Sequence, residues 1–349
     1  MNRRHHKTTV YLALLGLSFS LSVQAQQNAR PPGLKAKIRG DKDVQEIVLL
    51  GRSEEDKVIF AYASAPNVRS RIEPENLELL DVEYEYNRSA VLKALREQNW
   101  LSAALTLLPA IKPSLQFLDI PGNELTPLAF ETAIYFMRAA NTKAILADTD
   151  AARAGSKEYE FASDIFRQVG KAHWYLNAPE AEVLAVYCLT KLSKFETATT
   201  ALEAIAIPGE NEPAYGLYFL TQAEIRYANS EFREALRALS QSLMFETKNI
   251  NSFPNALLLS GKCYEKIGNW HRARDVYFET ARLFQNTYWA KHANDRLVVI
   301  MNQGLTAEEE AADVDKVFFD VNEDMNEAVR THLNSLVEKQ KEEKRHESE

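Results

Sequence analysis

The spacing of apolar residues changes once along the chain, near Tyr86. Before it, β-branched and aromatic residues come in short runs that are separated by turn residues such as Gly51 and the group at 65–67. Runs of this kind favour strands and hairpins. We therefore expect a small β-sheet or barrel over residues 34–86. Its strands are expected at residues 46–51, 57–62 and 77–82, with a break at 65–67.

After Tyr86 the apolar residues follow the period of α-helices, and five segments place an aromatic residue three positions before an alanine. These pairs are Trp100/Ala103, Tyr159/Ala162, Phe195/Ala198, Phe232/Ala235 and Trp270/Ala273. The last four alanines are separated by 36, 37 and 38 residues. A nearly fixed period in this range is typical of stacked helical hairpins. The pattern predicts a mainly α-helical array over residues 87–304.

Each repeat has a physical logic. The aromatic residue is expected to begin the second helix of a hairpin, and the alanine lets the two helix backbones approach closely. In the last repeat, Gly261, Tyr264 and Ala273 have the spacing expected where two helices cross at small residues. One hairpin cannot bury its own apolar stripe, so neighbouring hairpins must stack.

The N-terminus has the pattern of a secretory signal peptide over residues 1–25. Arg3, Arg4 and Lys7 precede an apolar run at 10–23, and Ala25 provides a small residue at the cut. A run of this length is short for a bilayer core of ~30 Å. We expect cleavage after Ala25, a flexible lead at 26–33 and a periplasmic chain with no transmembrane segment. An uncleaved anchor is the alternative.

The final repeat resembles a tetratricopeptide repeat, with the pattern Leu257-x3-Gly261-x2-Tyr264-x3-Gly268-x4-Ala273-x3-Tyr277. The segment 284–293 resembles the junction between repeats of bacterial envelope proteins, with Gln285 and Thr287 where those proteins have Pro and Ser. The whole arrangement resembles exported tetratricopeptide-repeat proteins of the Verrucomicrobia group, and is loosely similar to Tol-associated coordinators and outer-membrane assembly factors. This resemblance implies protein binding in the cell envelope, beside a Ton- or Tol-type or outer-membrane assembly complex.

The C-terminal part is expected to form an amphipathic helical segment over residues 305–337, followed by a charged tail at 338–349. Its apolar stripe consists of Met325, Val329, Leu333, Leu336 and Val337. This stripe offers an alternative function, in which the protein self-assembles through the C-terminal helix.

Charge and composition exclude several function classes. The chain has 41 Lys and Arg against 49 Asp and Glu, a net charge of −8, and no basic stripe, which argues against nucleic-acid binding. It lacks a His-Glu-x-x-His motif, a Gly-x-Ser-x-Gly elbow and a phosphate-binding glycine loop. We therefore expect no enzyme activity, metal or cofactor. A hydrolase that uses carboxylates in the groove is the remaining catalytic alternative.

The two cysteines, Cys188 and Cys263, occupy equivalent positions two repeats apart, each ten residues before a repeat alanine. Helices pack ~8–10 Å apart, so the two thiols are too distant for a disulfide bond. We interpret both as small apolar core residues.

Partner-binding residues are expected on the first helices of the hairpins, facing a concave groove. One register contains Tyr187, Glu224 and Lys262, and a second contains Lys191, Ala228 and Lys266, with Tyr227 beside Ala228. A ladder of aromatic and charged side chains suits an extended peptide or a partner helix. The sequence thus predicts a non-catalytic interaction scaffold, with other envelope proteins as partners.

Overall fold

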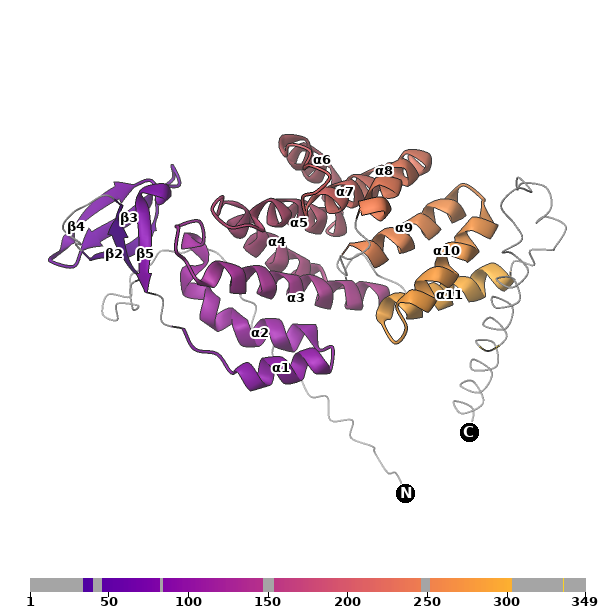
Figure 1. The fold of residues 1–349 in the computed structure, drawn as a ribbon, viewed down its shortest axis with the longest axis horizontal. Helices are drawn as coiled ribbons and strands as arrows, with labels where there is room; N and C mark the ends of the chain where they lie inside the picture. Colours follow the sequence, from indigo (N-terminus) through magenta and orange to yellow (C-terminus); the bar gives the residue numbers. More distant parts are fainter. Residues whose placement is uncertain are drawn as a thin grey trace, which may run out of the picture. The chain divides into compact units, whose positions relative to one another are not determined.

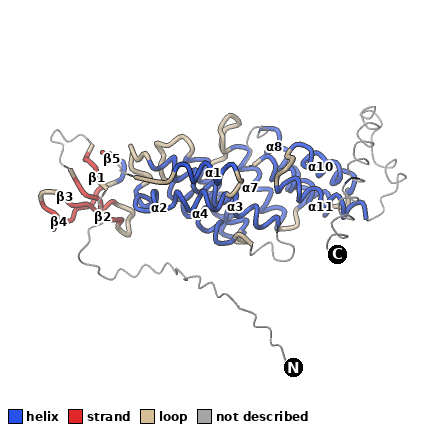
Figure 2. Tube along the Cα trace, turned by 90° about the horizontal axis from the view of Figure 1, so that it is seen from below, coloured by secondary structure: helices blue, strands red, loops and turns tan. Residues whose placement is uncertain are grey.

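The computed structural model describes residues 34–39, 46–81, 84–146, 154–245 and 252–302, together with residue 335. Within these ranges the protein is mainly α-helical, with one small antiparallel sheet on the N-terminal side (Figures 1 and 2). The predicted signal peptide at 1–25, the lead at 26–33 and the tail at 338–349 lie outside the described residues. So does the segment at 305–337, apart from residue 335.

The sheet has five antiparallel strands in the order β4-β3-β2-β1-β5. Their bounds are β1 Lys35–Ile38, β2 Ile47–Arg52, β3 Val58–Tyr62, β4 Ala65–Ile72 and β5 Leu77–Asp81. The short 3-10 turn Pro74–Asn76 leads into β5. Ile47, Val58 and Phe60 are buried on one face of the sheet. The expected β module and three of its strands are confirmed.

The prediction of a break at 65–67 is wrong. The chain turns at 63–64 instead, and β4 begins at Ala65. Pro66 is tolerated within β4 because that strand lies at the edge of the sheet, and because the register with β3 shifts beside Tyr62. Edges and bulges are the places in a sheet where proline does not remove a needed hydrogen bond.

The helices follow one another along the chain without a further strand in the described ranges. Their bounds are α1 Arg88–Arg96, α2 Trp100–Ile111, α3 Leu125–Leu146, α4 Ser156–Gly170, α5 Ala178–Lys191, α6 Phe195–Ala204, α7 Tyr215–Ala228, α8 Phe232–Phe245, α9 Phe253–Lys266, α10 Trp270–Leu283 and α11 Tyr288–Asn302, with the 3-10 helix η2 at Lys112–Phe117. Asn87, Asn99 and Asn269 cap α1, α2 and α10 through their side-chain oxygens.

The aromatic–alanine pairs lie where the repeat pattern predicts. α2, α6, α8 and α10 each begin at the aromatic residue, whereas α4 begins three residues before Tyr159. The five alanines are fully buried, namely Ala103, Ala162, Ala198, Ala235 and Ala273. The helices meet closely at these positions because alanine adds so little volume between them.

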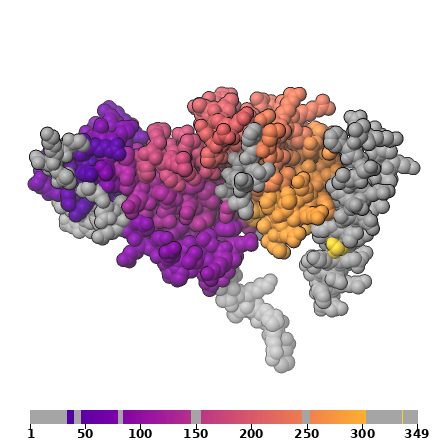
Figure 3. All heavy atoms as spheres, viewed as in Figure 1, coloured from indigo at the N-terminus to yellow at the C-terminus, as the bar shows by residue number. Residues whose placement is uncertain are grey.

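Helices that are consecutive in the chain pack against each other, and a second set of contacts joins alternate helices. α5 packs on α7, α7 on α9 and α9 on α11. In Figure 3, which is coloured by residue number, neighbouring parts of the described surface accordingly come from neighbouring parts of the chain. One further contact departs from this order, because α11 also touches α3. Helices distant in sequence therefore lie against each other.

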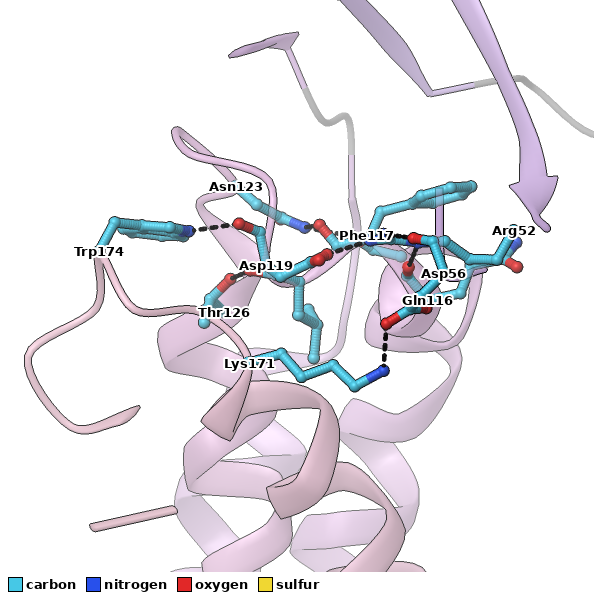
Figure 4. Close-up of polar contacts among 11 residues, drawn as sticks. Arg52, Asp56, Gln116, Phe117, Asp119, Asn123, Thr126, Lys171 and Trp174 are labelled. Atoms are coloured by element: carbon cyan, nitrogen blue, oxygen red, sulfur yellow. Dashed lines mark hydrogen bonds and ion pairs between the residues drawn. The ribbon is translucent and has the colours of Figure 1, made fainter. Parts of the chain in front are cut away.

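Polar contacts join the sheet to the helices (Figure 4). Arg52, at the end of β2, donates from Nε to the carbonyl of Gln116 at 2.8 Å and forms an ion pair with Asp119. The indole of Trp174 donates to the carbonyl oxygen of Asp119 at 2.9 Å, and Lys171 pairs with Asp56 at 2.7 Å.

Apolar residues continue this junction. The sheet residue Phe60 belongs to the same buried cluster as Phe117 and Leu118, which follow α2. The buried amide of Asn123 donates to Phe117 O at 2.9 Å and to Ser114 Oγ at 2.8 Å, which fixes the Pro-rich connection before α3. The sheet and the helices thus share one core.

Candidate functional site

Charged side chains of alternate helices meet along α5, α7 and α9. Lys191, the last residue of α5, forms an ion pair with Glu224 of α7. The two side chains are 24% and 13% exposed, so water screens this pair only weakly. Burial lowers the pKa of Lys191, but Glu224, Tyr159 and Cys188 together raise it by more, so the pKa lies above its usual value. Lys191 is therefore charged at neutral pH.

The next helices supply a second pair. Arg296 of α11 binds Glu265 of α9 through two hydrogen bonds, Nε to Oε1 at 3.0 Å and Nη2 to Oε2 at 2.5 Å. The sequence reasoning missed both residues. Glu265 lies one helical turn after Lys262, and this spacing is the signal that could have identified it. No comparable signal marks Arg296, because α11 lies after the last aromatic–alanine pair.

Lys262 lies between these two pairs and is partly buried. It has no hydrogen-bond or ion-pair partner among the residues that the structure describes. Burial lowers the pKa of its ammonium group, and the positive charge of Lys191 lowers it further, against the opposing effect of Glu224. Lys262 therefore differs from Lys191, whose charge is neutralised.

His292 of α11 is influenced by the charges of Lys262, Arg296 and Glu265, and is itself uncharged at neutral pH. Burial lowers its pKa to about 4, and the charges of Lys262 and Arg296 act in the same direction. Its Nε2 atom is buried and has no hydrogen-bond partner among the residues that the structure describes. We call the seven residues Tyr187, Lys191, Glu224, Lys262, Glu265, His292 and Arg296 the inner polar cluster.

Tyr187 corrects one expectation. Only 1% of it is exposed, so it does not face an open groove. Its ring packs under Lys191, whose Nζ is 4.9 Å from the ring centroid. The hydroxyl group of Tyr187 is buried, with no hydrogen-bond partner in the described part of the chain. Burial raises its pKa well above the usual value, and the Glu224 carboxylate adds to this effect. The phenol is therefore neutral.

A neighbouring tyrosine shows the contrast. Tyr159 of α4, 3% exposed, donates from its hydroxyl group to Asn141 Oδ1 of α3 at 2.5 Å. Burial also raises the pKa of Tyr159 well above that of a free phenol, with Tyr187 as the next largest influence. Two buried tyrosines on the packed helices α4 and α5 thus differ in one respect, because only Tyr159 has a partner for its hydroxyl group among the described residues.

The remaining candidates lie at the edge of this region. Tyr227 is half-buried and packs on Phe232, with ring centroids 5.4 Å apart. Lys266 is exposed at the end of α9. Of the six predicted partner-binding residues, Lys191 and Glu224 are thus in direct contact, and Lys266 is the most accessible.

The two cysteines have no role in the cluster's chemistry. Both are free and fully buried, as expected for core residues. Burial raises the pKa of both thiols, that of Cys263 to about 12. A thiol with a raised pKa is a poor nucleophile at neutral pH.

No protein-family model and no curated protein matches this chain. Within the described ranges, no group of three or more His, Cys, Asp or Glu side chains is arranged to hold a metal ion. The helices in those ranges are also too short or too polar to cross a membrane. The arrangement of side chains is therefore the basis for a functional hypothesis.

Proposed function

We propose that the protein is a non-catalytic interaction scaffold of the bacterial cell envelope, built as a tetratricopeptide-like solenoid. The observation that carries this proposal is the packing of α5, α7, α9 and α11 on one another, which brings their charged side chains together. Such a series of helices offers a partner one repeated contact per hairpin. Lys266, exposed at the end of α9, lies one turn beyond Lys262 and extends the charged face toward solvent.

The proposed partner is a peptide or helix of another envelope protein, which could belong to a Ton- or Tol-type or an outer-membrane assembly complex. Since Tyr187 is buried, we expect the partner to contact charged residues at the edge of the binding surface, its rim, and not a row of aromatic side chains. Rim charges chiefly affect association rate and specificity.

In-cell photo-crosslinking tests this proposal. A photoreactive residue replaces Lys266 in the tagged full-length chain, and crosslinked proteins are identified by mass spectrometry. We expect one or a few envelope proteins to be captured. We further expect capture to be lost when Lys191 and Glu224 are both replaced by Gln. This double substitution removes both charges of the ion pair and leaves no unpaired charge.

The matched control replaces Glu234 and Arg237 by Gln. This pair on α8 is also an ion pair, at 3.3 Å, but its side chains are 48% and 80% exposed. The control should retain full capture. Equal loss in both variants would contradict recognition by the charged face. Capture of this protein alone would instead support self-assembly.

Export to the periplasm is part of the proposal. N-terminal sequencing of the protein purified from a bacterial envelope fraction should begin at Gln26. A chain that begins at Met1 and stays in the cytoplasm would contradict the location.

A further inference from the structure

The sheet has one edge that no other described strand covers. β4 stands at the end of the strand order and pairs with β3 alone among the described strands. With eight residues it is also the longest of these strands. Alternate N–H and C=O groups of an edge strand point away from its neighbour, and such a row of groups can pair with a strand of another chain.

The opposite edge of the sheet is partly covered. β5 ends the sheet there, and Leu79 of this strand donates from its backbone nitrogen to the carbonyl oxygen of Pro121 at 3.2 Å. Figures 1 and 2 both show β5 on the side of the sheet near the helices and β4 on the far side. No described helix packs extensively on β4. The β4 edge is therefore the accessible one.

Only the first half of β4 is unsuited to further pairing. Pro66 has no N–H group to donate, and the register with β3 shifts between Ala61 and Tyr62. The second half is regular, because each residue from Arg69 to Ile72 lies opposite one residue of β3. An added strand can therefore pair with this second half, which we call the open edge.

The open edge carries two positive charges on one face of the sheet. Arg69 and Arg71 are two residues apart, so their side chains lie on the same face. Both residues are exposed, and neither guanidinium group forms an ion pair or a hydrogen bond with a described residue. The whole chain, by contrast, has a net charge of −8. These arginines favour an acidic partner and repel a second copy of β4, because like charges opposite each other destabilise a strand pair.

The other face of the open edge continues the core of the sheet. Ser70 lies opposite Phe60 and Ile72 lies opposite Val58, and both β3 residues are buried. Ile72 itself is partly buried against the same apolar cluster. An added strand would therefore place acidic side chains beside the arginines and apolar side chains beside Ile72.

We propose that the open edge of β4 binds an extended acidic peptide of another protein, which adds to the sheet as a further strand. Backbone hydrogen bonds supply the attachment, and alternation of acidic and apolar residues in the peptide supplies the specificity. Arg69 and Arg71 pair with the acidic residues. This surface is separate from the charged residues of α5, α7 and α9, so the failure of one proposal does not affect the other.

The probe is a short synthetic peptide of alternating glutamate and valine, added to the purified full-length protein. Hydrogen exchange in β4 should slow as the peptide saturates the protein. The double variant Arg69→Gln/Arg71→Gln should weaken binding by about three- to tenfold, because two charge pairs are lost. The matched control is Arg88→Gln/Arg96→Gln, which removes two exposed arginines from α1 and should leave the affinity unchanged.

Methylation of peptide nitrogens tests the backbone pairing. The N–H groups of alternate residues point to opposite edges of an extended peptide. One modified peptide is therefore methylated on its glutamate nitrogens and the other on its valine nitrogens. A peptide bound in one orientation pairs through one edge, so one of the two should bind like the parent peptide and the other should not.

Three results would overturn the proposal. If both methylated peptides bind like the parent, charge attraction acts without strand pairing. If the α1 control loses as much affinity as the β4 variant, the attraction is not specific to the open edge. If light scattering shows a dimer in which the β4 amides are already protected from exchange, a second copy of the chain covers this edge.

Discussion

Gly261 of α9 lies directly against the ring of Tyr277 in α10. A Cβ atom added at Gly261 would be 2.5 Å from Cε1 and 2.6 Å from Cζ of that ring. Tyr277 is 0% exposed, so the ring has no solvent into which it could move. The contact shows in atomic detail why the last repeat has glycine at this position.

Gly261→Ala is therefore expected to lower the free energy of unfolding by about 1–3 kcal/mol, the usual cost of overpacking a core. This loss occurs although alanine is about 1 kcal/mol better than glycine in a helix. Urea unfolding measures it. Gly209→Ala is the control, because a Cβ there meets its nearest atom at 3.5 Å.

The same contact predicts coupling between the two positions. In a Tyr277→Leu background the Gly261→Ala substitution should cost less, because the ring that it would strike is gone. A double-mutant cycle measures this. Simple additivity of the two substitutions would show that Gly261 matters for another reason.

Tyr159 and Tyr187 give a prediction from their different hydroxyl groups. Tyr159→Phe removes the hydrogen bond to Asn141 and should destabilise the protein by about 1–2 kcal/mol. Tyr187→Phe removes a buried hydroxyl group that has no partner among the described residues, and should be neutral or stabilising. Thermal unfolding compares the two variants. Equal destabilisation would mean that the Tyr187 hydroxyl group does have a hydrogen-bond partner.

His292 predicts a pH dependence. Its pKa of about 4 in the folded protein lies below the usual 6.5, so between these values the unfolded chain binds more protons. Stability must then decrease as the pH falls from about 6.5 to 4, by about 1–3 kcal/mol from this residue. Urea midpoints at pH 7 and pH 5 should differ less in His292→Gln than in the natural protein. Exposed His173→Gln is the control and should retain the full pH difference.

The ion pair of Arg52 with Asp119 is expected to stabilise the attachment of the sheet to the helices. Burial raises the pKa of Asp119, and Arg52 opposes this effect. Arg52→Met leaves a largely buried carboxylate without its cation and should cost about 2–4 kcal/mol. Hydrogen exchange of the β2 and β3 amides should rise. Lys171→Gln, which breaks the exposed pair with Asp56, should cost less than about 1 kcal/mol. Similar effects of both substitutions would show that burial of Asp119 does not matter.

The sequence by itself determined the two-part division near Tyr86, the start of four helices at aromatic residues and the burial of five alanines. It could do so because these features depend on local periodicity and on side-chain size. The break at 65–67 was misjudged, because whether a proline disrupts a strand depends on the strand's place in the sheet. Pro66 lies in an edge strand, and that place is not a local property.

Only the tertiary structure decided which charged residues meet. The repeat register aligned Tyr187 with Glu224 and Lys262, whereas packing pairs Glu224 with Lys191, one turn further along α5. Likewise, nothing local places Arg296 on Glu265 or α11 against α3. Periodicity fixes which face of each helix is apolar, but the angle between successive helices depends on how their side chains interdigitate. Small angles add up over many hairpins, and their sum determines which distant residues come into contact.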